Sequence, residues 1–209
     1  MDKSLSFKGT INPLKIITHP IETVEELKEK KNGSVFSASI ILALYTIAEI
    51  ILTVAKGFIF NTARIQDFNI FMVLARSLFL ILLFVLANWA LCTLLDGEGR
   101  LVDIYIATCY SLIPLVAIKF VEVICSNVLT ADEYVFVGMI SMCCTLWFVC
   151  LILFSLKTIH NYTLGKTILN AIATVIGMVI IFFLIFLFIV LVQQLYIFFA
   201  TIATEIMMR

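Results

Sequence analysis

Residues 168–192 read ILNAIATVIGMVIIFFLIFLFIVLV, an unbroken apolar run of 25 residues with no charged side chain. A helix needs about 20 mostly apolar residues to cross a hydrocarbon core about 30 Å thick. Four earlier runs meet the same condition, each bounded by polar or charged residues: Val35–Ala55, Phe71–Leu95, Ile104–Cys125 and Tyr134–Leu156. These continuous runs predict an all-α polytopic bundle of five transmembrane helices, because a membrane barrel would alternate apolar and polar residues.

The composition of the 209-residue chain excludes a water-soluble protein. Hydrophobic residues make up 63% and charged residues 13%, with a mean hydropathy of +1.14, whereas a soluble domain is about 25% charged. The formal net charge is +0, and without a clustered basic face a nucleic-acid partner is excluded. All six cysteines lie in apolar runs and none forms a CxxC pair, so we expect no disulfide framework, metal site or cofactor.

The distribution of Lys and Arg predicts the orientation, because cytoplasmic loops hold the excess of these residues. Nine of them lie on the side of the N-terminus and three on the other side. We therefore expect a cytoplasmic N-terminus and a C-terminus outside. After Val192 the apolar run is interrupted by Gln193 and Gln194 and then resumes, which leaves open whether the last helix continues out of the bilayer or bends along its surface.

Residues 1–34 form a segment of different character from the transmembrane domain at 35–209. His19-Pro20 opens a charged helix, and Ile21, Val24 and Leu27 recur on it at three-residue spacing. This pattern favours an amphipathic element on the inner membrane surface. A solvated helix that leads into the first span, or one that docks a cytosolic partner, fits the same residues.

Four ionisable side chains fall within the predicted spans, where charges are costly and normally face the bundle interior. At about 1.5 Å of rise per residue, all four lie in the outer half of the bilayer. They are Glu49, Arg76, Lys119 and Glu122. Two positive and two negative charges at one depth predict an intramembrane ion-pair network joining the first three spans. The alternatives are two cations that reach the headgroups independently, or a pathway open to the outside.

A neutral polar layer lies nearer the cytoplasm, with Asn88 in the second span and Tyr110 and Ser111 in the third. We interpret these residues as packing devices, since hydrogen bonds between membrane helices contribute about 0.6 kcal/mol on average. Pro114 follows and predicts a kink. Between the two spans, Asp96, Gly97 and Gly99 predict a tight glycine-rich turn.

Enzyme signatures are absent from the sequence. It contains no HExxH, GxSxG, P-loop or GxGxxG motif, and these are the spacings that metal, acyl-transfer and nucleotide chemistry require. The two histidines, His19 and His160, lie outside the predicted spans and far apart in the sequence. The sequence therefore predicts a protein that is not an enzyme.

The segment around the glycine-rich turn resembles the centre of Yip-domain proteins. The resemblance rests on Asn88-Trp89, the run LLDGEGR at 94–100, Asp103-Ile104 and the run YSLIP at 110–114. The N-terminal His19-Pro20 with its charged helix is similar to bacterial members. The resemblance implies five spans with a cytoplasmic N-terminus. The eukaryotic branch binds Rab-type GTPases and has an Asp-Leu-Tyr-Gly-Pro element before the first span, which this sequence lacks.

The sequence and the resemblance together predict a membrane scaffold or accessory protein that acts by protein contacts in membrane organisation, trafficking or transport assemblies. The alternative is a small transporter or channel subunit that uses the outer charge layer. The expected partners are the lipid bilayer and other membrane proteins, such as a transporter or trafficking component, and an oligomer is compatible with the sequence. If the protein is bacterial, its membrane is the plasma membrane.

Overall fold

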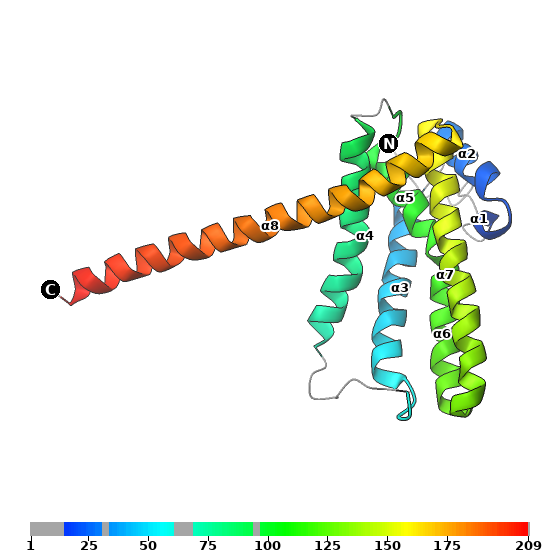
Figure 1. Ribbon diagram of the computed structural model, residues 1–209, viewed down its shortest axis with the longest axis horizontal. Helices are drawn as coiled ribbons and strands as arrows, with labels where there is room; N and C mark the ends of the chain where they lie inside the picture. Colours follow the sequence, from blue (N-terminus) through cyan, green and yellow to red (C-terminus); the bar gives the residue numbers. More distant parts are fainter. Residues whose placement is uncertain (1–14, 31–33, 61–68, 94–96, 209) are drawn as a thin grey trace, which may run out of the picture.

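Figure 1 shows the computed structural model, which describes residues 15–30, 34–60, 69–93 and 97–208. All regular structure in these ranges is helical. The helices are α1 (Lys15–Thr18), α2 (Pro20–Lys30), α3 (Val35–Ala55), α4 (Ile70–Cys92), α5 (Leu101–Ser111), α6 (Ile113–Val128), α7 (Ala131–His160) and α8 (Leu164–Met207).

Among the described residues, five helical stretches are long and apolar enough to cross a membrane: α3, α4, α5 with α6, α7, and α8. The prediction of an all-α bundle with five transmembrane helices is therefore confirmed. In Figure 1, α3, α4, α6 and α7 run side by side, whereas α8 crosses α4 and leaves the bundle. We call the end of the bundle that carries α2 and the start of α8 the His160 end.

Polar residues at the helix starts explain several of the observed boundaries. The Ser34 hydroxyl accepts from the Ser37 N–H at the start of α3, and the Asn69 carboxamide oxygen accepts from the Phe71 N–H at the start of α4. Thr130 and Glu133 form a capping box at α7. Each cap satisfies backbone donors that have no partner inside the helix.

The third span is interrupted at Leu112, two residues before Pro114. The Leu112 N–H bonds to the carbonyl of Cys109, a tightened turn that ends α5. Pro114 stands in the first turn of α6, where the missing N–H of proline removes no helical hydrogen bond. The proline ring therefore begins a new helix after the interruption.

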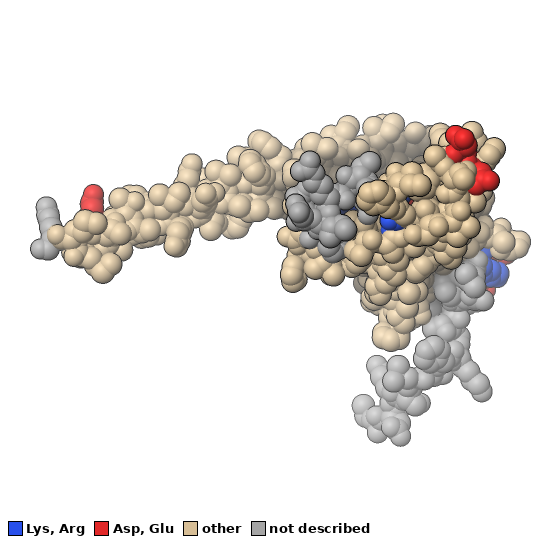
Figure 2. Space-filling view, turned by 90° about the horizontal axis from the view of Figure 1, so that it is seen from below, with Lys and Arg blue, Asp and Glu red and all other residues tan. Residues whose placement is uncertain are grey.

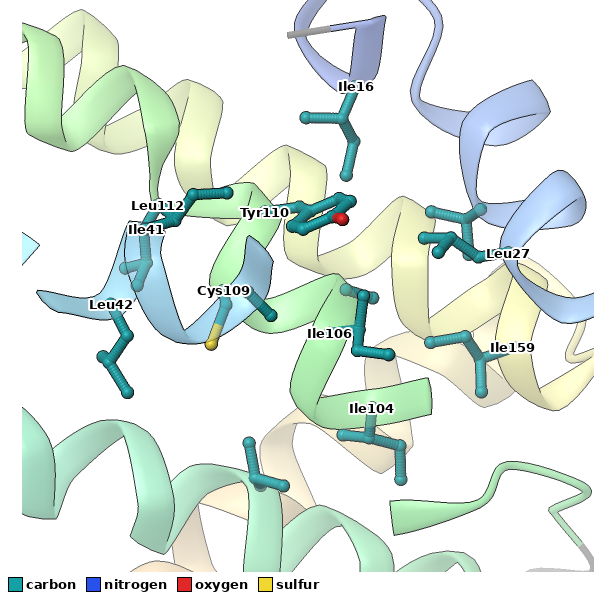
Figure 3. Close-up of a cluster of buried hydrophobic side chains, with 14 of the residues drawn as sticks. Ile16, Leu27, Ile41, Leu42, Ile104, Ile106, Cys109, Tyr110, Leu112 and Ile159 are labelled. Atoms are coloured by element: carbon teal, nitrogen blue, oxygen red, sulfur yellow. The ribbon is translucent and has the colours of Figure 1, made fainter. Parts of the chain in front are cut away.

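The core of the bundle gathers around α5, the most enclosed of the spanning stretches. Figure 3 shows Ile104, Ile106, Cys109 and Tyr110 of α5 among apolar side chains from α3, α7 and the N-terminal helices. Ile104, Cys109 and Tyr110 are fully buried. The helices that pack on α5 thus cover its apolar side chains. Because α5 is held in this core, it also fixes the position of the turn that precedes it.

The N-terminal helices pack on this core. The buried side chains of these helices are Ile16 of α1 and Val24 and Leu27 of α2. Helix α2 lies against α5 and α7. Figure 3 places Ile16 and Leu27 beside Tyr110 and Ile159. Two of the three apolar residues that recur on α2, Val24 and Leu27, are therefore covered by protein, whereas the third, Ile21, is exposed. Residues 1–14 and 31–33 of the predicted N-terminal segment lie outside the described residues.

The last helix is much longer than a membrane span. It continues without interruption through Gln193 and Gln194 to Met207, so its 44 residues measure about 66 Å. Every described side chain from 191 to 208 is exposed. Figure 2 shows this arm as an almost uncharged rod. The structure thus shows that the last helix does not end at Gln193 or Gln194.

Candidate functional site at the His160 end

The turn between α4 and α5 passes very close to the end of α7. A Cβ atom added to Gly99 would collide with the imidazole Cε1 of His160 and lie 2.6 Å from its Nδ1. A Cβ on Gly97 would lie 2.6 Å from the Tyr162 hydroxyl and 3.0 Å from Nδ1. Such distances are far inside van der Waals contact, so both glycines are required by close approach. Asp96 of the predicted turn lies outside the described residues.

A series of hydrogen bonds, which we call the His160 chain, runs from this turn through the bundle. The Gly99 N–H donates to His160 Nδ1 at 3.2 Å, so Nδ1 carries no proton and the Nε2–H faces the Asn88 carboxamide oxygen at 3.1 Å. The Asn88 amide donates to Thr174 Oγ1 at 3.0 Å, and that hydroxyl donates to the Asn170 carbonyl at 2.7 Å. A neutral His160 thereby joins the turn and α7 to α4 and α8.

The members of this chain are withdrawn from solvent and lipid. Asn88 and Thr174 are fully buried and His160 is 2% exposed. Asn170 is also fully buried, and its side-chain atoms have no hydrogen-bond partner among the described residues. A buried polar group left unpaired costs about 1–3 kcal/mol, so the chain fixes the packing of α8 on α4 by penalising any shift that breaks it.

Sequence reasoning found Asn88 and missed its partners. His160 follows the apolar core of α7 by only a few residues, and Thr167, Asn170 and Thr174 recur at 3 and 4 residues along an apolar helix. That spacing places all three on one helix face, and all three are buried. A search for polar residues at helical spacing in the last span would have detected them.

Glu98 joins three segments at the surface of this end. Its Oε2 accepts from Lys28 Nζ of α2 at 3.1 Å and from Asn161 Nδ2 at 2.8 Å. Asn161 ends α7 in the left-handed conformation, with φ of 54°. A cavity of about 640 Å³ opens beside these groups, between α2 and the end of α7. The exposed ion pair alone is worth little, whereas the three-way junction positions α2 over the cavity.

The predicted outer charges are arranged around one close pair. Lys119 Nζ of α6 lies 2.9 Å from Glu49 Oε1 of α3, and the two side chains are 16% and 15% exposed. The Tyr45 hydroxyl donates to the same oxygen at 2.9 Å, and the Lys119 ammonium lies 5.5 Å from the Tyr45 ring centroid. These three residues link α3 to α6.

The other two predicted charges are not part of this group. Arg76 is exposed on α4, Glu122 is half-buried on α6, and neither forms a salt bridge within the described part of the chain. The structure therefore brings together two of the four charges. Depth along a helix follows from its rise, but the face of a residue depends on how the helix is rotated against its neighbours.

The predicted inner polar layer is divided as well. Asn88 belongs to the His160 chain, whereas the Ser111 hydroxyl bonds back to the Ala107 carbonyl of its own helix. Tyr110 is fully buried, and its hydroxyl has no hydrogen-bond partner among the described residues. Tyr110 acts chiefly as the largest side chain of the core.

Comparison with known proteins identifies the family. The Yip1 domain model matches residues 14–191, a range that contains the turn, His160 and all the transmembrane helices up to Leu191. Neither the curated proteins nor the solved structures contain a match. With its five apolar helices, the protein is a multi-pass integral membrane protein whose helices contact lipid. The chain belongs to the Yip1-domain family.

Proposed function

We propose that this protein is a membrane scaffold or accessory protein without enzymatic activity, with its N-terminus in the cytoplasm. It acts by binding other membrane proteins in trafficking or transport assemblies. Yip1-domain proteins are not known as enzymes, and membership of the family favours membrane-protein partners.

The observation that carries the proposal is the apolar core between the two polar groups. Ile41, Leu42, Ile81 and Cys109 are buried between the Glu49–Lys119 pair and the His160 chain. The buried hydroxyl of Thr46 in this region bonds back to the carbonyl of Leu42 in its own helix. A substrate path needs a polar or water-filled lining, and close-packed apolar side chains favour a rigid binding scaffold instead.

The arm of α8 supports the same proposal, because it extends an apolar surface well beyond the bundle. We expect a partner helix to pack on it. The test places a photo-crosslinking residue at exposed Val179, Phe188 or Tyr196 in native membranes, with buried Leu151 as the control position. Adducts to one recurrent membrane protein at the α8 positions support the proposal. Adducts to lipid alone at every α8 position would contradict it.

A transporter subunit is the second candidate, and the Glu49–Lys119 pair is the observation that favours it. Charges 15–16% exposed within a span are costly and commonly mark ion pathways. The purified protein in liposomes distinguishes the two candidates. Ion or solute flux that is lost in Glu49→Gln, while the variant stays folded, would replace the scaffold proposal with a transport function.

A further inference from the structure

The cavity at the His160 end has charged walls of both signs. Its volume is about 640 Å³, within the range of about 300–1,000 Å³ typical of small-ligand sites. The charged side chains among its lining residues are Glu25 and Lys28 from α2, Glu98 from the turn, and Lys157 from α7. They carry two positive and two negative charges, so the cavity lining has no net charge that would favour a simple anion or a simple cation.

Two of the four charges already satisfy each other, and two do not. Lys28 and Glu98 form the ion pair described above. The side chains of Glu25 and Lys157 take part in no ion pair or hydrogen bond with described residues. The cavity therefore presents one available carboxylate and one available ammonium from opposite walls. The complement of this pair is a molecule that carries both an ammonium and an anionic group.

The position of the cavity indicates where such a molecule comes from. It lies at the end of the membrane-spanning helices, beside the start of α8, and apolar Ile21 forms part of its wall. Leu164 and Ile168 in the first turns of α8 are exposed. A lipid headgroup held in the cavity would leave its acyl chains next to these apolar side chains.

The aromatic side chain in the wall distinguishes between types of ammonium. Quaternary ammonium groups are recognised by cages of free aromatic faces. Tyr162 is the aromatic residue of this lining, but its ring already stacks on His160 and lies 4.9 Å from the Lys166 ammonium. A carboxylate such as Glu25 instead accepts charge-assisted hydrogen bonds from a primary ammonium.

We propose that this cavity binds the headgroup of a phosphatidylethanolamine lipid. Lys157 binds the phosphate, and Glu25 accepts hydrogen bonds from the ammonium. The ion pair between Lys28 and Glu98 holds α2 in place as the opposite wall. The site gives the protein a preference for ethanolamine lipid over choline lipid, which offers no hydrogen-bond donor, and over phosphatidylglycerol, which has no ammonium.

The test uses the purified full-length protein in detergent with an equimolar mixture of phosphatidylethanolamine, phosphatidylcholine and phosphatidylglycerol. Native mass spectrometry measures which lipid is retained. We expect ethanolamine lipid to predominate, and we expect Lys157→Gln and Glu25→Gln each to reduce its retention about tenfold, since each removes one charge-assisted contact. Lys157→Arg should retain the preference because it keeps the charge.

Matched control variants separate this site from a general charge effect. Lys15→Gln and Glu22→Gln remove exposed charges of the same kind outside the cavity lining, and both should leave the preference unchanged. Equal retention of the three lipids, a preference for phosphatidylglycerol, or an ethanolamine preference that survives both Lys157→Gln and Glu25→Gln would overturn the proposal. Thermal unfolding of each variant establishes that the bundle is intact.

Discussion

At the scale of single residues, the approach of the turn to His160 makes Gly99 the most constrained position of the site. We expect Gly99→Ala to lower the free energy of unfolding by about 1–3 kcal/mol, because overpacking forces a shift of the backbone or of His160. Thermal unfolding in detergent measures the loss. Gly138→Ala is the matched control, since an added Cβ there meets nothing within 4 Å. Equal effects at the two positions would contradict the argument.

The hydroxyl of Thr174 links Asn88 to α8, which gives a second prediction for a single residue. Thr174→Val keeps the shape but leaves the Asn88 amide without its acceptor, so we expect a loss of about 1 kcal/mol. Thr201 makes the same bond to its own helix, from Oγ1 to the Ile197 carbonyl, on the exposed arm. Thr201→Val should therefore change the unfolding temperature little. A loss at Thr201 as large as at Thr174 would show that the Asn88 bond is not the cause.

At the scale of helices, the Glu49–Lys119 pair joins α3 to α6, and its two charges depend on each other. Lys119→Met alone leaves Glu49 without a counter-charge inside the bundle, and we expect it to cost about 2 kcal/mol, less than for a fully buried pair. Glu49→Gln combined with Lys119→Met should recover most of that loss. A double-mutant cycle by thermal unfolding measures the coupling. Arg76→Gln is the control, because exposed Arg76 has no salt bridge within the described residues, and we expect little change.

The docking of α2 on α5 and α7 gives a prediction about accessibility. Leu27 is 6% exposed, so Leu27→Asp places a charge against the core and should release α2 from the bundle. We expect faster trypsin cleavage after Lys28, measured on protein whose bundle still unfolds at its usual temperature. Ile21→Asp is the control, because Ile21 is 41% exposed. An unchanged cleavage rate in Leu27→Asp would show that α2 is held by other contacts.

These elements differ in how far the sequence predicts them. The five spans follow from uninterrupted apolar runs, because a long apolar segment in a membrane can satisfy its own backbone hydrogen bonds only as a helix. The partners of Asn88 do not follow, because His160 and Thr174 come from distant parts of the chain and meet only through packing. The length of α8 does not follow from the sequence either. Gln193 and Gln194 interrupt the apolar run, but glutamine does not end a helix.

At the scale of the whole molecule, the protein consists of a bundle closed by the His160 end and an arm that extends from it. The contacts of α8 with α4 lie in its first half: Thr174 binds Asn88, a Cβ added at Gly177 would lie 3.2 Å from Leu91, and Phe182 packs edge-on against Phe79. The first half of α8 thus packs on the bundle, whereas the second half forms the exposed arm.

This division of α8 into a packed half and an exposed arm leads to the last prediction. A chain that ends at Val192 keeps every contact between α8 and α4 described above, and the described side chains that it removes are all exposed. We therefore expect its thermal unfolding in detergent to match that of the full chain. If the arm binds partner proteins, crosslinking from Phe188 to the partner should weaken, because the adjoining apolar surface is lost. A truncated chain that fails to fold would mean that the arm stabilises the bundle itself, and a folded chain with undiminished crosslinking would place the partner's binding surface before Val192.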